Sequence, residues 1–196
     1  MHQGDGRMKY IGVLGLQGGV EEHHHLLAQL PEVKSIDVKY ISQLEEIDGL
    51  IIPGGESTTL GRLLRVFNML EPLKQKVLAG LPVWGTCAGM ILLAKEIEEE
   101  TTKHLEVMDI TVRRNAYGRQ LGSFETMQQV NAVEKAIPLV FIRAPLVSKI
   151  GEQVGILAEV RGEIVACKEK NMLATSFHPE LTTDTSFHHY FVKDLC

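Results

Sequence analysis

Short apolar segments alternate with helical segments along the first half of this 196-residue chain. The expected strands cover residues 10–16, 36–41, 49–52 and 83–85, and the expected helices cover residues 20–30 and 57–79, the second divided near Pro72. Parallel strands need crossover connections of this kind, so the alternation predicts a mostly parallel sheet with helices on both faces. The expected fold class is therefore α/β, with three layers.

The second half of the chain has a different pattern, in which short strand-like runs are separated by Gly, Asn and Pro. These runs cover residues 107–114, 123–130, 140–143, 154–160, 163–167 and 172–176, and a closing helix is expected over residues 184–195. They predict an antiparallel extension of the sheet. Because no repeat, low-complexity tract or linker interrupts the sequence, we expect residues 8–196 to form a single domain after a disordered leader over residues 1–7.

Composition and charge argue against several classes of partner. The net charge of −5 offers no basic surface for nucleic acid. No apolar run approaches the roughly 18 residues of a membrane-spanning helix, so no membrane contact is expected. The cysteines, Cys87, Cys167 and Cys196, are odd in number and widely spaced. This spacing favours free thiols in the cytoplasm over a disulfide framework or a zinc site.

A candidate nucleophile lies in the segment L-P-V-W-G-T-C-A-G-M, where an apolar strand enters a Gly-x-Cys-x-Gly turn and a helix follows. Gly85 and Gly89 permit a tight bend, so Cys87 is expected in a strained conformation that points outward. The start of the helix favours the thiolate, and the Ala88 N–H can stabilise an oxyanion. The alternative, a buried structural cysteine, stays open at this point.

A base and a carboxylate follow the last expected strand, as His178 and Glu180 in F-H-P-E-L. In an extended chain, residues two apart face the same side, so the imidazole can lie between the carboxylate and the sulfur. Pro179 favours this extended backbone at His178. An exposed or capping histidine is the alternative.

The segment I-I-P-G-G-E-S-T is the third candidate, because a strand that ends in Gly-Gly exposes backbone N–H groups for an oxyanion. Ser57 or Thr58 is expected to cap the helix that follows. A simple strand-to-helix turn is the alternative, and the Gly-Lys-Ser/Thr end of a phosphate-binding loop is missing. The triplet His23, His24 and His25 cannot converge on one metal ion, so it is expected to be a solvated helix face, as are His188 and His189.

Five segments in this order, G-G-E-S-T-T, G-T-C-A-G-M, R-R-N-A-Y-G-R-Q, F-I-R-A-P and F-H-P-E-L, resemble the PdxT/SNO family of class I glutamine amidotransferases, the glutaminase subunits of pyridoxal 5′-phosphate synthase. The resemblance covers nearly the whole chain after Arg7. It implies a class I glutamine amidotransferase fold of flavodoxin-like type and a catalytic triad of Cys87, His178 and Glu180.

The resemblance also implies the residues that bind glutamine, namely Gly55, Glu56, Ser57, Arg114, Ile142 and Arg143. A guanidinium suits the α-carboxylate of glutamine, although an ordinary surface ion pair is the alternative for both arginines. Gly55 and Ala88 would form the oxyanion hole, and Gln17 would lie near the active site and the synthase contact. Arg113 and Arg119 receive no role.

The implied reaction is hydrolysis of L-glutamine through a cysteine thioester, with no metal and no organic cofactor. By resemblance, the ammonia passes to a TIM-barrel synthase subunit in a hetero-oligomer. Three alternatives remain: a glutaminase subunit of another amidotransferase, such as the one feeding imidazole glycerol phosphate synthesis; a cysteine hydrolase of the DJ-1/PfpI type; and a non-catalytic regulatory subunit. The H-P-E-L segment argues against the second, and the intact triad argues against the third.

Overall fold

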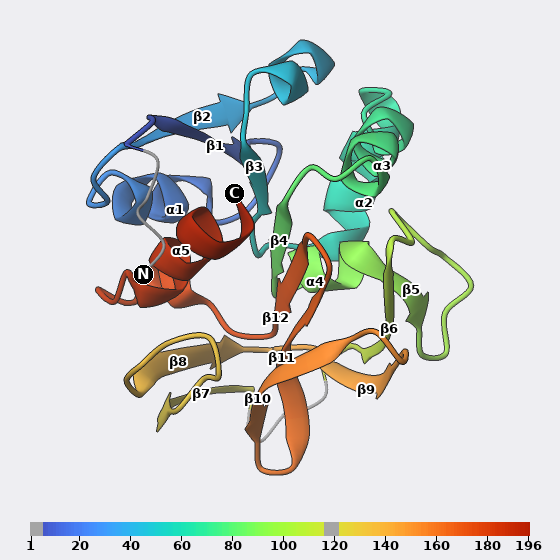
Figure 1. The fold of residues 1–196 in the computed structure, drawn as a ribbon. Coiled ribbons are helices and arrows are strands. Elements are labelled where there is room, and N and C mark those ends of the chain that lie inside the picture. Colours follow the sequence, from blue (N-terminus) through green and yellow to red (C-terminus); the bar gives the residue numbers. More distant parts are fainter. Residues whose placement is uncertain (1–5, 116–121) are drawn as a thin grey trace.

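The computed structural model describes residues 6–115 and 122–196. Its main element is a ten-stranded sheet in the order β2-β1-β3-β4-β12-β11-β9-β6-β5, with β10 paired to β11 (Figure 1). Its parallel part consists of β1 (Lys9–Leu14), β2 (Val33–Val38), β3 (Gly49–Ile52), β4 (Val83–Thr86) and β12 (Met172–Thr175).

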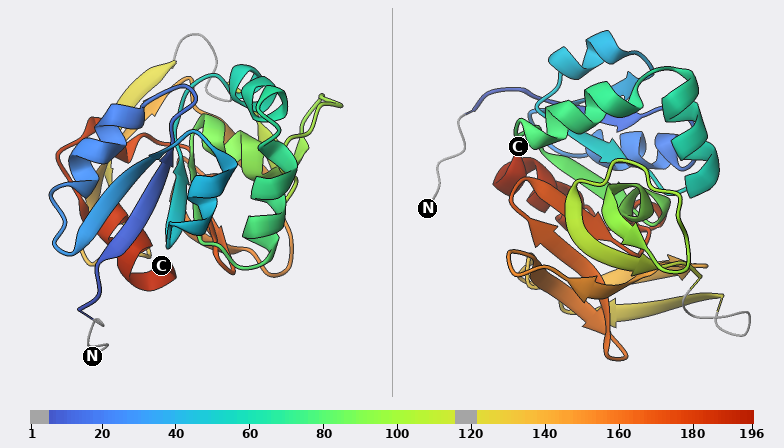
Figure 2. Two further views of the ribbon diagram at one scale, coloured as in Figure 1. Left: turned by 90° about the horizontal axis from the view of Figure 1, so that it is seen from above. Right: turned by 90° about the vertical axis from the view of Figure 1, so that its right-hand side faces the viewer.

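The rest of the large sheet consists of β5 (Ala94–Ile97), β6 (Met108–Arg113), β9 (Leu146–Ile150), β10 (Gly155–Val160) and β11 (Glu163–Glu169). Here β11 is antiparallel to β12, β9 and β10, and β6 is antiparallel to β9. A separate antiparallel pair is formed by β7 (Ser123–Gln128) and β8 (Ile137–Ile142). The right-hand view of Figure 2 places β7, β8 and β10 at the end of the molecule opposite the helices that follow β3.

Helices cover both faces of the parallel strands (Figure 1). On one face lie α1 (Val20–Leu27) and α5 (Ser186–Tyr190), and on the other lie α2 (Ser57–Val66), α3 (Leu70–Leu78) and α4 (Ala88–Leu93). Short helical segments are η1 (Ile41–Glu45), η2 (Pro179–Leu181) and η3 (Phe191–Leu195). Among the residues described, no helix has the length and apolar character that crossing a membrane requires.

The apolar core is divided by the sheet into two clusters. Leu50 and Ile52 of β3 pack with the side chains of α2, α3 and α4, whereas Ile51 between them packs with those of α1 and α5. Successive side chains of a strand point to opposite faces, so a strand buried on both faces must be apolar throughout. The sequence G-L-I-I of β3 meets this requirement, and all four residues are buried.

The predicted α/β class, the parallel sheet covered on both faces and the antiparallel part are confirmed. Several details differ. The helical stretch 57–79 breaks at Phe67–Met69, not at Pro72, because Asn68 has a positive φ of 54° and Pro72 lies in the first turn of α3, where no N–H is needed. The segment expected as a strand over residues 36–41 ends at Val38.

Other differences concern elements that the sequence pattern did not predict. Strands β5 and β9 and the turn η1 were not expected, and β7 with β8 forms its own sheet instead of extending the large one. The expected closing helix is shorter and continues as the π-helical segment η3. Residues 116–120 of the R-R-N-A-Y-G-R-Q segment and residues 1–5 of the expected leader lie outside the described part of the chain.

Candidate active site

The candidate site lies at the carboxyl ends of adjacent parallel strands. Gln17 follows β1, Gly54 and Gly55 follow β3, Cys87 follows β4, and His178 follows β12. These strands are neighbours in the order β1-β3-β4-β12. Ligand sites of open α/β sheets occur at this edge, where the loops after neighbouring strands meet. The fold therefore brings together side chains that are far apart in sequence.

Cys87 occupies the tight turn between β4 and α4, with φ 48° and ψ −103°. Such a backbone is costly for a residue with a side chain, so the predicted strained turn is confirmed. A Cβ on Gly85 would collide with the backbone of Gly89, and a Cβ on Gly89 would collide with the carbonyl oxygen of Ile52. The Cys87 side chain does not point outward as expected: the residue is only 8% exposed and faces a pocket.

His178 and Glu180 form the second part of the site. The backbone N–H of His178 donates to Val140 O of β8 at 2.8 Å. The ring atom Nδ1 of His178 lies 2.7 Å from Glu180 Oε1. The expected pairing is present, but its expected cause is wrong. Pro179–Leu181 is a 3₁₀ turn instead of extended chain, and this turn carries the carboxylate back toward the imidazole.

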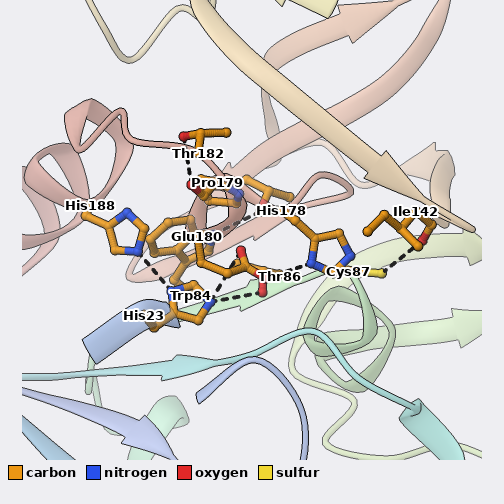
Figure 3. A network of polar contacts seen from close by, with 11 residues as sticks. His23, Trp84, Thr86, Cys87, Ile142, His178, Pro179, Glu180, Thr182 and His188 are labelled. Carbon is orange, nitrogen blue, oxygen red and sulfur yellow. Dashed lines mark hydrogen bonds and ion pairs between the residues drawn. The ribbon is translucent and has the colours of Figure 1, made fainter. Parts of the chain in front are cut away.

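The protonation of His178 follows from its two polar neighbours. Burial alone would lower the pKa of His178, but hydrogen bonds to Cys87 and Glu180 outweigh it and raise this pKa to about 10. Figure 3 shows the His178 ring between Glu180 and the Cys87 sulfur. A protonated imidazole is therefore expected at neutral pH, and it is the partner that a thiolate needs.

The glycine loop after β3 packs directly against these catalytic candidates. The Gly19 N–H donates to Gly54 O at 3.0 Å, and the Glu56 N–H donates to Gln17 Oε1 at 2.9 Å. A Cβ on Gly54 would collide with the His178 ring, and a Cβ on Gly55 would collide with the Gln17 amide. Gly54 is thus required by its close approach to the His178 ring, whereas a Cβ on Gly55 would displace the end of the Gln17 side chain.

Glu56, and not Ser57 or Thr58, caps helix α2. Its carboxylate accepts from Thr58 N at 3.2 Å and from Thr59 N at 2.7 Å, and the hydrogen bonds to Thr59 lower the pKa of Glu56. The expected cap is wrong because the two oxygens of a carboxylate satisfy two N–H groups at once. The Ser57 hydroxyl instead accepts from Arg114 Nη2.

Arg114 reaches the pocket from the end of β6. Its Nη2 also lies 3.3 Å from Thr58 Oγ1, and its Nε lies 2.9 Å from Glu100 Oε1. Arg114 is thus fixed by an ion pair on one side while its guanidinium lies beside Ser57 on the other. At the end of β8, Ile142 O lies 4.0 Å from Cys87 Sγ, and Arg143 has a positive φ of 43°.

One cavity of about 510 Å³ joins these groups, a size that suits a small polar metabolite. Its lining includes every residue predicted for the site: Gln17, Gly55, Glu56, Ser57, Cys87, Ala88, Arg114, Ile142, Arg143, His178 and Glu180. The remaining lining residues are Gly54, which belongs to the predicted Gly-Gly pair, and six that the sequence did not single out: Gly18, Gly19, Ile91, Asn115, Pro145 and Leu181. Residues 6–115 and 122–196 contain no group of three or more His, Cys, Asp or Glu side chains that could hold a metal ion.

The expectation of a solvated histidine face is wrong for two residues. His23 and His188 are completely buried, whereas His25 and His189 are exposed. Helical spacing explains the difference, because His23 lies on the same face of α1 as Leu26 and Leu27, which pack into the core. This i, i+3, i+4 pattern was the signal that could have identified His23.

The comparisons with known proteins agree with this geometry. The profile of the SNO glutamine amidotransferase family matches residues 13–196. The chain is 59% identical over 187 residues to a Ruminiclostridium cellulolyticum protein named pyridoxal 5′-phosphate synthase subunit PdxT, with 95% of this chain and 99% of that protein covered. A Clostridium botulinum protein of the same name is 55% identical over 183 residues, with 93% and 95% covered. A crystal structure described as a glutamine amidotransferase superposes with a TM-score of 0.86 at 43% identity, covering 92% of this chain and 96% of that one.

Proposed function

Because this chain belongs to the SNO glutamine amidotransferase family, we propose that residues 8–196 act as one glutaminase domain with Cys87, His178 and Glu180 as its catalytic triad. The chain is the glutaminase subunit of pyridoxal 5′-phosphate synthase. It hydrolyses L-glutamine to L-glutamate and ammonia and supplies the ammonia to the synthase subunit. The observation that supports the triad most strongly is the meeting of these three side chains in one cavity.

The first half-reaction forms a thioester. The Cys87 thiolate attacks the side-chain amide carbon of glutamine, and the carbonyl oxygen becomes a tetrahedral oxyanion. The N–H groups of Gly55 and Ala88 stabilise this charge, since Ala88 is the first residue of α4 and Gly55 lies in the loop after β3. His178 then gives its proton to the leaving nitrogen, the carbon–nitrogen bond breaks, and ammonia departs.

The second half-reaction releases glutamate. Neutral His178 takes a proton from water while the water oxygen attacks the thioester carbon, and the same N–H groups stabilise the second oxyanion. The carbon–sulfur bond breaks, glutamate leaves, and the Cys87 thiolate again faces a protonated His178. Glu180 accepts from His178 Nδ1 throughout, which keeps the other ring nitrogen directed at the reacting atoms.

The substrate is oriented by the opposite wall of the cavity. The Arg114 guanidinium, which lies beside Ser57, binds the α-carboxylate of glutamine. Arg143 adds positive charge to the same cavity. Gly55, Glu56, Ser57 and Ile142 complete the contacts with the bound amino acid. Gln17, whose amide oxygen accepts from the Glu56 N–H, links this wall to the loop at the synthase contact.

The partner is a TIM-barrel synthase subunit in a hetero-oligomer, and the complex is cytoplasmic. The names of the relatives from R. cellulolyticum and C. botulinum support the synthase partner, the motifs shared with their family support its TIM-barrel fold, and the free cysteines favour the cytoplasm. Those names also favour this partner over the subunit that feeds imidazole glycerol phosphate synthesis. A regulatory subunit without activity would not need the arrangement of Cys87, His178 and Glu180.

A glutaminase assay of the complex tests the proposal. The wild-type chain with its synthase subunit is expected to release glutamate from L-glutamine, and Cys87→Ala is expected to reduce this rate by about a thousandfold or more. Cys196→Ala is the matched control, because this cysteine lies at the C-terminus outside the cavity lining and is expected to leave the rate unchanged. Undiminished glutamate release by Cys87→Ala would exclude the proposed nucleophile.

A further inference from the structure

Glu180 has an oxygen that the catalytic triad does not use. The side chain is 1% exposed; Oε1 lies against His178, but Oε2 is buried and has no hydrogen-bond partner among the described residues. A buried carboxylate oxygen without a donor is costly. The group placed to offset this cost is His23 of α1, whose Nε2 lies 3.6 Å from Oε2.

His23 belongs to a buried row of polar groups behind the triad (Figure 3). Its Nδ1 lies 2.9 Å from His188 Nε2 of α5, and its Nε2 lies 3.5 Å from Thr86 Oγ1 of β4. The ring of Trp84 packs against the rings of both His23 and His188. His188 Nδ1 has no hydrogen-bond partner among the described residues, so the row ends there.

Both histidines of this row are neutral. Burial is the main cause that lowers the pKa of His23 well below its usual value, and the nearby His188, His178 and His24 act in the same direction. Burial also lowers the pKa of His188 to about 3, against a small opposite effect of Asp184. The charged and titratable groups that face His23 are therefore Glu180 and His178, the neighbouring His188 and, on its own helix, His24.

A neutral imidazole carries one N–H, so the contacts decide where the proton lies. If His23 carried its proton on Nδ1, a bare Nε2 lone pair would face the negative Glu180 oxygen, and His188 would be left with a buried N–H on Nδ1 that meets no acceptor. If His23 carries it on Nε2, that N–H faces Oε2, and His23 Nδ1 accepts from His188 Nε2–H. The second arrangement satisfies the 2.9 Å contact with His188 and directs the Nε2–H toward Glu180 Oε2 at 3.6 Å, with Thr86 Oγ1 beside it at 3.5 Å.

We propose that His23 is a positioning residue of the glutaminase reaction, which directs its Nε2–H at Glu180 Oε2 and is itself oriented by His188. The inference rests on the proposed function. At 3.6 Å the contact is longer than a standard hydrogen bond, so His23 acts as a fixed dipole toward the carboxylate charge. It thereby keeps Oε1 directed at His178.

The test compares His23→Leu with His23→Gln in the complex with the synthase subunit. His23→Leu removes both nitrogens and is expected to lower kcat by about tenfold with little change in KM for glutamine, because the substrate does not touch His23. Because the hydrogen bond to Glu180 helps to raise the pKa of His178, a less well directed Oε1 should lower that pKa, which titration of the His178 ring signals by NMR measures. His23→Gln, which can place an N–H near the same oxygen, should restore most of kcat and the wild-type titration of His178.

His25→Leu is the matched control, because His25 lies on the same helix but is exposed, and it should behave as wild type. A folded His23→Leu complex with wild-type kcat would overturn the inference, and so would an unchanged His178 titration with no recovery of kcat in His23→Gln. If His23→Leu does not fold, nitrogen NMR of histidine-labelled wild-type chain in the complex decides: Nε2–H at His23 supports the proposal, and Nδ1–H overturns it. Absence of glutamate release by the wild type would instead overturn the proposed function.

Discussion

At the scale of single residues, the protonation of the His178 ring depends on the Cys87 sulfur beside it. The hydrogen bond to Cys87 is the first of the effects that raise the pKa of His178 to about 10 against the opposing effect of burial. Cys87→Ala removes this effect and leaves burial unchanged, so the pKa of His178 should fall toward neutral pH. Titration of the His178 ring signals by NMR measures the shift.

A matched variant separates this effect from general loosening of the site. Cys167→Ala removes a buried thiol that lies in β11, outside the cavity lining, and it should leave the His178 titration where it is in the wild type. An unchanged titration in Cys87→Ala would mean that the thiolate does not hold the proton on His178. The thiolate–imidazolium pair in the proposed mechanism would then be wrong.

Arg114 is expected to act in binding and not in chemistry. Its planar guanidinium can bind a carboxylate with two parallel hydrogen bonds while Nε contacts Glu100, and a lysine ammonium cannot do both. Arg114→Lys should therefore raise KM for glutamine by about tenfold or more with little change in kcat. Steady-state kinetics of the complex measure this.

The neighbouring arginine is the control for that substitution. Arg113 is exposed and pairs with Glu98 at 2.7 Å, away from the cavity lining. Arg113→Lys should leave both kinetic constants unchanged. If Arg114→Lys lowers kcat and leaves KM unaltered, the α-carboxylate is bound elsewhere.

At the scale of elements, the turn between β4 and α4 limits which residues the chain accepts. A Cβ on Gly89 would collide with the carbonyl of Ile52 at the end of β3, and backbone cannot move aside as a side chain can. Gly89→Ala should lower the free energy of unfolding by about 1–3 kcal/mol and also reduce activity, because it displaces Cys87. Urea unfolding followed by fluorescence of the single, buried Trp84 measures stability.

Gly155→Ala is the comparison, since a Cβ there meets only Lys168 O at 3.9 Å. That variant should unfold at nearly the wild-type urea concentration and keep full activity. Equal behaviour of the two variants would show that α4 can shift away from β3 at little cost.

Local patterns predicted those elements whose causes lie within a few residues. The Gly-x-Cys-x-Gly turn and the apolar strand β3 are of this kind, because the first needs small residues and the second needs burial on both faces. The break between α2 and α3 was misplaced, since a residue other than glycine adopts the positive φ there, at Asn68. Strand β5 was missed because A-K-E-I has only two buried residues and is specified by pairing with β6.

At the scale of the whole molecule, the site depends on a contact that local patterns do not specify. Strand β12 comes after the antiparallel strands in sequence, yet it lies next to β4 and runs parallel to it. The position of β12 next to β4 places His178 beside Cys87. It also places α5, with His188, against α1. The members of the triad could therefore be predicted from motifs and family resemblance, whereas the buried row from His188 to Glu180 could not.

The last prediction concerns the dependence of this chain on its partner. The carbonyl of Gly54 accepts from the Gly19 N–H, and Gly19 lies in the same loop as Gln17, where the family resemblance places the synthase contact. We expect this hydrogen bond to hold the Gly54–Gly55 peptide in a resting orientation in the isolated chain. Docking of the synthase on the loop should release the peptide and complete the oxyanion hole. Because one oxyanion donor is worth about a hundredfold or more, the complex should hydrolyse glutamine faster than the isolated chain by about that factor.

A single substitution separates release of the peptide from other effects of the partner. Gly19 has φ −75°, which proline adopts readily, so Gly19→Pro removes the N–H without requiring a new φ at that residue. Gly19→Ala keeps the N–H, and its Cβ would meet Glu180 Oε1 at an ordinary 3.4 Å. In glutaminase assays without the synthase, Gly19→Pro should be more active than the wild type, and Gly19→Ala should not. Equal rates for the isolated wild type and the complex would contradict the existence of a resting state. An inactive but folded Gly19→Pro would show that the hydrogen bond from the Gly19 N–H to Gly54 O does not maintain that state.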